Sequence, residues 1–153
     1  MSDVSEVVDE ANRLAKKDEA SLEVLLGMRA RAIEENPKLQ DDVDFEPEYD
    51  QGMMGPLDDV RALGRAILRR WNKDLYGLVC GKRTAIEKER AAILSALNLG
   101  ETAVIGAVAT ALLSLGVLPP IAAAAAPLIV KVFIWPAKDE LCISWAEAIK
   151  AQG

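Results

Sequence analysis

The feature that most constrains the fold of this chain is a long uncharged stretch in its last third. No Asp, Glu, Lys or Arg occurs between Glu101 and Lys131, a span of 29 residues. The segment Gly116 to Pro120 divides the stretch, because paired prolines end one helix and can begin the next. A helix that is apolar on every side is buried, either in a protein core or in a bilayer. The sequence therefore predicts a hydrophobic helical hairpin over residues 101–135.

The length of the two arms favours a protein core over a bilayer. The arms are expected at about 101–116 and 120–135, each roughly 24 Å long at 1.5 Å per residue. A bilayer core of about 30 Å needs nearer 20 residues. Pro127 falls inside the second arm, where it is expected to kink the helix. A central hairpin in a soluble bundle is therefore favoured, and insertion into a membrane is the alternative.

Apolar residues of the hairpin are the candidates for contact with the core, with a partner or with a membrane. In a soluble bundle four of them are expected inside: Val108, Leu112, Ile129 and Val132. The candidates for a membrane-facing or partner-facing surface are Val104, Val108, Leu112, Leu115, Leu118, Ile121, Ile129, Phe133 and Trp135. In architecture alone, a hydrophobic hairpin covered by amphipathic helices resembles colicin pore-forming domains and Bcl-2-like proteins, with which the chain shares no motif.

The rest of the chain shows the 3.6-residue period of amphipathic helices. Helices are expected at 2–16, with Ser2 as N-cap, and at 21–35, ended by Pro37; whether these are one bent helix or two is open. Further helices are expected at 57–79, from a capping box at Thr84–Glu87 to about Asn98, and at 137–150. The fold prediction is an all-α bundle of about six helices around the hairpin, forming a single domain over 1–153. Its parts are amphipathic helices at 1–36, an acidic loop at 37–56, two amphipathic helices at 57–99, the hairpin at 101–135 and a C-terminal amphipathic helix at 137–150.

Charge is distributed unevenly along the chain. Residues 1–50 carry a net charge of −9, whereas residues 51–100 carry +4. The acidic segment 41–50 is therefore expected to dock on the basic face of helix 57–79, with Phe45 and Tyr49 as apolar anchors. That candidate basic face consists of Arg61, Arg65, Arg69, Arg70 and Lys73.

The composition excludes most chemistry that a site could carry. The chain has no histidine, which is the commonest general base and metal ligand. The acidic run lacks the ordered spacing and the closing Glu of a calcium loop. Cys80 and Cys142 fit no metal or redox spacing, and two buried reduced thiols are favoured over a single disulfide. No catalytic residue, metal site or cofactor is predicted, and the net charge of −6 argues against nucleic acid as a partner.

The function predicted from these observations is that of a non-catalytic helical interaction protein, which oligomerises or docks to a protein partner. The alternative is a membrane-active protein of pore-forming, toxin or effector type, whose hairpin inserts into a bilayer. The N-terminus has no basic region followed by an apolar one, so secretion by a standard signal peptide is not expected. The expected location is the cytoplasm, with membrane association under the alternative.

Overall fold

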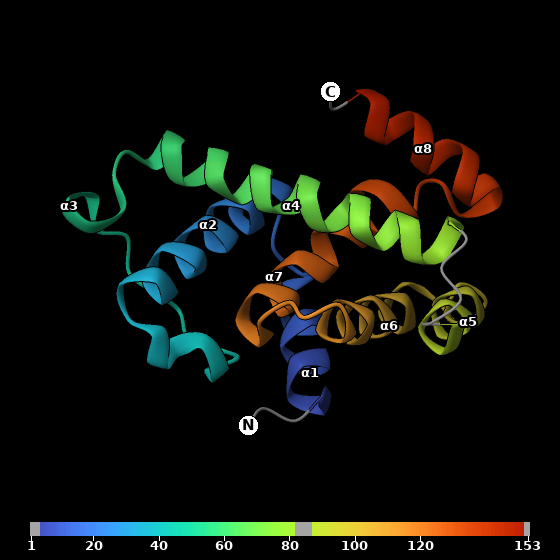
Figure 1. The fold of residues 1–153 in the computed structure, drawn as a ribbon, viewed down its shortest axis with the longest axis horizontal. Coiled ribbons are helices and arrows are strands. Elements are labelled where there is room, and N and C mark those ends of the chain that lie inside the picture. The colour runs from blue at the N-terminus through green and yellow to red at the C-terminus, as the bar shows by residue number, and fades with distance from the viewer. Residues whose placement is uncertain (1–3, 82–86, 152–153) are drawn as a thin grey trace.

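The computed structural model describes residues 4–81 and 87–151, and within them the protein is all-α. Eight α-helices and no strand occur in these two ranges (Figure 1). The helices are α1 (Val4–Leu14), α2 (Glu19–Glu35), α3 (Gln51–Met54), α4 (Leu57–Cys80), α5 (Glu87–Ala96), α6 (Glu101–Ser114), α7 (Pro119–Ile129) and α8 (Leu141–Ala151). Short 3-10 turns lie at Pro37–Asp41 and Lys138–Glu140, and a π turn at Val130–Ile134 continues α7.

The first two helices are separate, which answers the question that the sequence left open. Asp18 is the N-cap of α2, and its side chain accepts a hydrogen bond of 2.7 Å from the backbone N–H of Ser21. Such a cap satisfies one of the free N–H groups at a helix start and fixes where the helix begins. The expected cap at Ser2 and the capping box at Thr84–Glu87 involve residues outside the two described ranges.

Helices α2 and α4 pack on one another through two glycines. A Cβ atom on Gly64 would lie 1.9 Å from the backbone oxygen of Glu23. A Cβ on Gly27 would lie 2.0 Å from the backbone oxygen of Val60. Only glycine permits the two backbones to approach this closely, so the pair sets the distance between the helices.

Helix α7 lies in the middle of the molecule and is the most deeply buried helix (Figure 1). Every residue from Pro120 to Val130 is buried, and α1, α2, α4 and α6 all contact the helix. The largely aliphatic side chains at its surface join one contiguous cluster of buried residues, which includes all five alanines of 122–126. Pro127 lies within the helix, and a bend of 75° comes later, at the break between Ile134 and Lys138.

The first arm of the predicted hairpin is less buried than the second. Helix α6 buries Val104, Val108 and Leu112 completely and leaves much of its other side half-buried. Its small residues permit close packing of α1, since a Cβ on Gly106 would lie 3.1 Å from a methyl carbon of Val8. Of the four residues expected inside, Val132 is only half-buried, because it lies in the π turn, where the register of buried and exposed positions shifts.

The C-terminal helix packs against the end of α4. A disulfide joins Cys80 to Cys142 with a Cα–Cα distance of 5.6 Å, so the expectation of two buried reduced thiols is wrong. Cys142 is exposed, and the pairing depends on the return of α8 to α4, which residue spacing does not reveal. Deeper in the same contact, the indole N–H of Trp145 donates a 2.8 Å hydrogen bond to the side-chain oxygen of Asn72. The Tyr76 ring meets the Trp145 ring edge to face.

Candidate functional site

The hairpin residues singled out from the sequence lie mainly inside the protein. Six of the nine are buried: Val104, Val108, Leu112, Ile121, Ile129 and Phe133. Leu115 and Trp135 are half-buried, and Leu118 is 37% exposed at the tip of the hairpin. The tip turns at Gly116, whose φ of +93° favours glycine. In this conformation the hairpin offers a partner little more than its tip.

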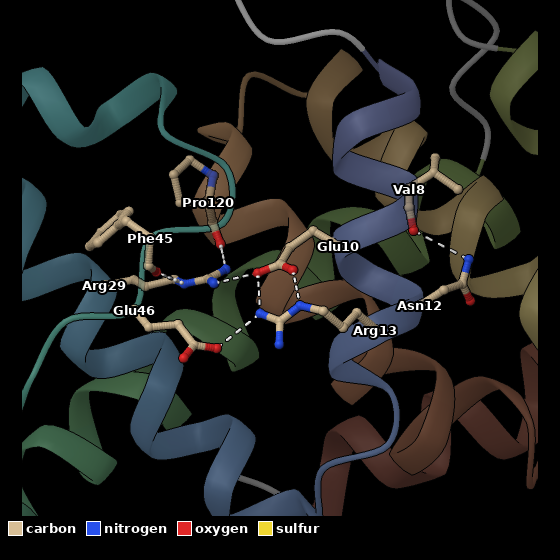
Figure 2. A network of polar contacts seen from close by, with 8 residues as sticks. All are labelled: Val8, Glu10, Asn12, Arg13, Arg29, Phe45, Glu46 and Pro120. Carbon is tan, nitrogen blue, oxygen red and sulfur yellow. Dashed lines mark hydrogen bonds and ion pairs between the residues drawn. The ribbon is translucent and has the colours of Figure 1, made fainter.

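A buried arginine holds the tip to the surrounding helices (Figure 2). Arg29 of α2 is completely buried, and its guanidinium reaches three different segments. It donates to the Glu10 carboxylate on α1 at 2.6 Å, to the backbone oxygen of Phe45 at 3.2 Å and to the backbone oxygen of Pro120 at 3.0 Å. The contact with Pro120 fixes the first turn of α7. We refer to this arrangement of Arg29 and its three partners as the Arg29 clamp.

A second arginine completes the charge balance of the Arg29 clamp. Arg13 donates two hydrogen bonds to the carboxylate of Glu10, at 2.6 and 2.9 Å. It also donates to Glu46 in the acidic segment at 2.9 Å. Glu10 is therefore shared between one buried and one half-exposed guanidinium. A buried carboxylate with this number of charged donors is fully satisfied.

The ionisation of the clamp follows from burial and from these contacts. Burial alone raises the pKa of the Glu10 carboxyl, but the hydrogen bonds and charges of Arg13 and Arg29 outweigh it, so the net pKa lies below the ordinary value. Burial lowers the pKa of the Arg29 guanidinium, and the contact with Glu10 opposes this effect. Hydrogen bonds to Glu10 and Glu46 raise the pKa of Arg13. At neutral pH the clamp is thus an ion pair, since guanidinium groups stay protonated in proteins.

Sequence reasoning missed the Arg29 clamp. A signal for it does exist in the helical period. Glu10 lies between Val7 and Leu14 on the apolar stripe of α1, and Arg29 lies four residues after Leu25 on the buried side of α2. Opposite charges on the apolar stripes of two consecutive helices indicate a buried pair.

The expected basic face of α4 divides into two parts. Arg61 and Arg65 donate to the two carboxylate oxygens of Glu23 on α2, at 2.9 and 3.1 Å. The acidic segment therefore does not supply their partner, contrary to expectation, because the close packing of α2 and α4 brings Glu23 nearer. The remaining residues, Arg69, Arg70 and Lys73, are exposed, and none of the described acidic side chains pairs with them. The guanidinium of Arg70 lies 4.7 Å from the ring centre of Trp71.

Among the described residues, three exposed large apolar side chains lie close together in sequence, between α2 and the first residue of α4. Tyr49, Met53 and Leu57 are 41%, 44% and 48% exposed, and they lie within nine residues of one another. We call these three residues the 49–57 surface. Tyr49 and Met53 line a groove of about 740 Å³, and Leu57 lines a second groove of about 480 Å³. Both grooves include Pro47 in their walls.

The 49–57 surface is held in place by polar and apolar contacts together. The side chain of Asp50 accepts a hydrogen bond of 2.9 Å from the backbone N–H of Gly52 and begins α3, a helix that the sequence did not predict. The Tyr49 hydroxyl donates to the backbone oxygen of Gly55 at 2.7 Å. Of the expected anchors, Phe45 is half-buried and Tyr49 is exposed, whereas Met54 is buried without having been expected.

No group of three or more His, Cys, Asp or Glu side chains in 4–81 and 87–151 is placed to hold a metal ion. No single helix in those ranges has both the length and the apolarity needed to cross a bilayer. The two consecutive segments Pro119–Ile134 and Lys138–Ala151 meet the criterion of length and composition jointly, across their 75° bend.

Comparison with protein-family models, with curated proteins and with solved structures found no match to this chain.

Proposed function

We propose that this protein is a non-catalytic interaction protein, which binds a protein partner through its helical surface. In this proposal the bundle is built around the 101–135 hairpin, and the partner contacts the outside of the bundle. The observation that supports the proposal is the 49–57 surface. It presents three large apolar side chains, each more than two-fifths exposed, and each of them lines one of the two grooves. Exposed apolar side chains that line grooves are typical of binding sites.

The position of this surface in the chain supports the same proposal. Tyr49 and Met53 lie on a connection that contains only a 3-10 turn and the four-residue α3, between the two long helices α2 and α4, and Leu57 is the first residue of α4. Long connections with little regular structure are uncommon in compact proteins unless they have a function. The two helices supply a rigid base, on which a connecting segment can present side chains to a partner.

Site-specific photocrosslinking in the native host tests the proposal. A photoreactive residue in place of Met53 is expected to give one discrete adduct, which is then identified and remade from purified components. The control is the same substitution at Ile143, which is 64% exposed on α8 and equally apolar. An adduct of twice the chain mass would indicate self-association, and another mass would indicate a second protein. Folded protein that gives no adduct at Met53, or the same adducts at both positions, would contradict the proposal.

A second candidate function is supported by the tip of the hairpin. Leu118 is exposed there, and it lines a groove of about 240 Å³ together with Trp71, on which Arg70 stacks. An exposed apolar tip beside an aromatic ring on which a cation stacks is a combination that suits a membrane surface with anionic lipids. A membrane-active protein would release the tip from the Arg29 clamp and insert the hairpin.

Leakage of dye from anionic vesicles tests this candidate. The wild type is expected to release dye, and Leu118→Asp is expected to fold normally but to release little. Carrying a carboxylate into lipid costs about 2.5–3.5 kcal/mol on insertion scales. Folded wild type that neither binds nor permeabilises these vesicles, at neutral or acidic pH, would exclude the candidate.

A further inference from the structure

The larger of the two grooves beside the 49–57 surface has walls of one electrostatic sign. One wall is formed by Ala32, near the end of α2, and by Leu39 in the following 3-10 turn. The other wall is the segment from Phe45 to Met54. The charged residues in its lining are both acidic, Glu48 and Asp50. The smaller groove differs, because Lys17 and Arg61 line it together with acids.

The apolar part of the larger groove can adapt to an incoming side chain. Tyr49 and Met53 are exposed at its edge, Phe45 is half-buried in its wall and Met54 is buried behind it. Methionine side chains are flexible and polarisable, and they are common at surfaces that accept different partners. The volume of about 740 Å³ is sufficient for one or two large apolar side chains.

Acidic side chains around this groove are available for pairing with a partner. Glu46 is already paired with Arg13, and Asp50 caps the first turn of α3. In contrast, no cation in the described part of the chain pairs with Glu48. The cation nearest in sequence is Lys38, an exposed residue beside Leu39. The charged side chains that line the groove are thus both negative, and the Arg29 guanidinium behind Phe45 is buried and already paired with Glu10.

From these walls and their charge we infer that the larger groove binds a basic amphipathic helix of another protein. The apolar side of that helix fills the space beside Tyr49 and Met53, and its Lys and Arg side chains lie along Glu48 and Asp50. Amphipathic helices bind apolar grooves in this way, and opposite charges set orientation and association rate. A second copy of this chain is disfavoured as the occupant, because two chains of net charge −6 repel one another.

The inference rests on the proposed function and is tested with defined peptides. The probe is a labelled synthetic helix of Leu and Lys in a 3.6-residue period, and its matched counterpart carries Glu in place of every Lys. Fluorescence anisotropy with folded wild-type protein is expected to show that the Lys peptide binds. The affinity for the Glu peptide is expected to be at least about tenfold lower. Equal binding of both peptides would overturn the inference, and so would binding of neither.

Charge-reversal variants separate a specific groove from general attraction to an acidic protein. Glu48→Lys in the groove and Glu147→Lys on the exposed side of α8 change the net charge equally. Glu48→Lys is expected to weaken binding of the Lys peptide about tenfold, and Glu147→Lys is expected to weaken it by less than about twofold. Equal weakening would overturn the inference, because net charge alone would then explain the binding.

Two further measurements decide between failure of this inference and failure of the proposed function. Sedimentation of the protein alone would overturn the inference if it showed a dimer that Glu48→Lys dissociates, since the occupant would then be a second copy. An adduct at Met53 without binding of the Lys peptide would overturn the inference and leave the proposed function in place. Absence of both would overturn the two together.

Discussion

At the scale of single residues, the buried ion pair of Arg29 and Glu10 illustrates how the chain makes a costly feature tolerable. Transfer of two charges from water to the interior costs several kcal/mol per ion unless hydrogen bonds satisfy them. Here the guanidinium is bonded through all three nitrogens, and the carboxylate receives bonds from two arginines. The same bonds connect α1, α2, the acidic segment and α7, so the pair specifies how four segments meet.

Glu10→Gln is expected to lower the free energy of unfolding by about 3–5 kcal/mol at pH 7, because Arg29 would keep its charge and lose its counter-ion. The pKa of Glu10 lies below its ordinary value of 4.5 in the folded protein. A carboxylate of this kind contributes stability that is present above its unfolded pKa and is lost as the pH falls through the folded pKa. The wild type should therefore lose this contribution below about pH 4.5, whereas the variant should not.

Urea denaturation at a series of pH values checks both parts of this expectation. Glu6→Gln is the matched control, since Glu6 is an exposed carboxylate on the same helix. It should change stability by less than about 0.5 kcal/mol. A similar effect from both substitutions would mean that the Arg29 clamp does not contribute to stability.

Gly64→Ala and Gly77→Ala are expected to have opposite effects although both lie in α4. A methyl group at Gly64 would meet the backbone oxygen of Glu23 and force α2 and α4 apart, at a cost of about 1–3 kcal/mol or more. A Cβ at Gly77 would have no neighbour within 4 Å, so alanine there should stabilise the helix by about 0.5–1 kcal/mol. Thermal unfolding of the two variants measures the difference; a loss of stability at Gly77 equal to that at Gly64 would refute the role of close packing.

At the scale of elements, α8 depends on its connection to α4 more than on its own burial. Only Leu141 and Trp145 of the helix are buried, and the disulfide links it across a sequence separation of 62 residues. A cross-link over a loop of this length stabilises a protein by roughly 2–4 kcal/mol, mainly by restricting the unfolded chain. The helix also buries the hydrogen bond between Trp145 and Asn72, which orients it.

Reduction of the disulfide should therefore lower the melting temperature without unfolding the rest of the protein. The double variant Cys80→Ser/Cys142→Ser is expected to have a free energy of unfolding lower by the same roughly 2–4 kcal/mol. Its melting temperature should not change when reductant is added. Calorimetry of wild type and variant, each with and without a thiol reductant, checks this. A variant that is as stable as the oxidised wild type would show that α8 is held by packing alone.

The elements predicted best from sequence are those whose period repeats over several turns. Helix α4 was expected at 57–79 and spans Leu57–Cys80, and α6 begins at Glu101 as expected. Helix α3 was missed because it is a single turn. It begins at the Asp50 cap, and Met54 is its one buried residue. Such a short element has no period to detect, and its stability comes from contacts that are distant in sequence.

The candidate site was harder to predict than the helices, for a related reason. The sequence shows that residues such as Val108 and Ile129 are apolar, but not whether this chain or a partner covers them. It marked Tyr49 as an anchor, whereas the structure exposes it and bonds its hydroxyl to Gly55. The pairing of Glu23 with Arg61 and Arg65 likewise follows from the crossing of α2 and α4, which depends on tertiary packing.

At the scale of the whole molecule, α7 at the centre and the shorter helices at the edge should differ in local stability. In amide hydrogen exchange followed by mass spectrometry, residues 122–126 are expected to stay protected longest. Their amides can exchange only when α7 separates from α1, α2, α4 and α6. Peptides from α3 and α5 should exchange first, since each of these helices buries only one or two residues and, unlike α8, neither is held by a disulfide. Early exchange in α7 would instead indicate that the hairpin leaves the core while the rest stays folded.

A charge placed in α7 or on the surface of α4 tests the same arrangement through folding. Ala124 is completely buried, so Ala124→Glu would put an unpaired carboxylate among apolar side chains and should abolish the folded state. Ala66 is exposed in the middle of α4, and Ala66→Glu should change the free energy of unfolding by less than about 0.5 kcal/mol. Circular dichroism and denaturant titration of the two variants measure this contrast. If Ala124→Glu folded with normal stability, α7 would have to reach solvent easily, and the membrane-active candidate would then explain the protein better than a permanently buried hairpin.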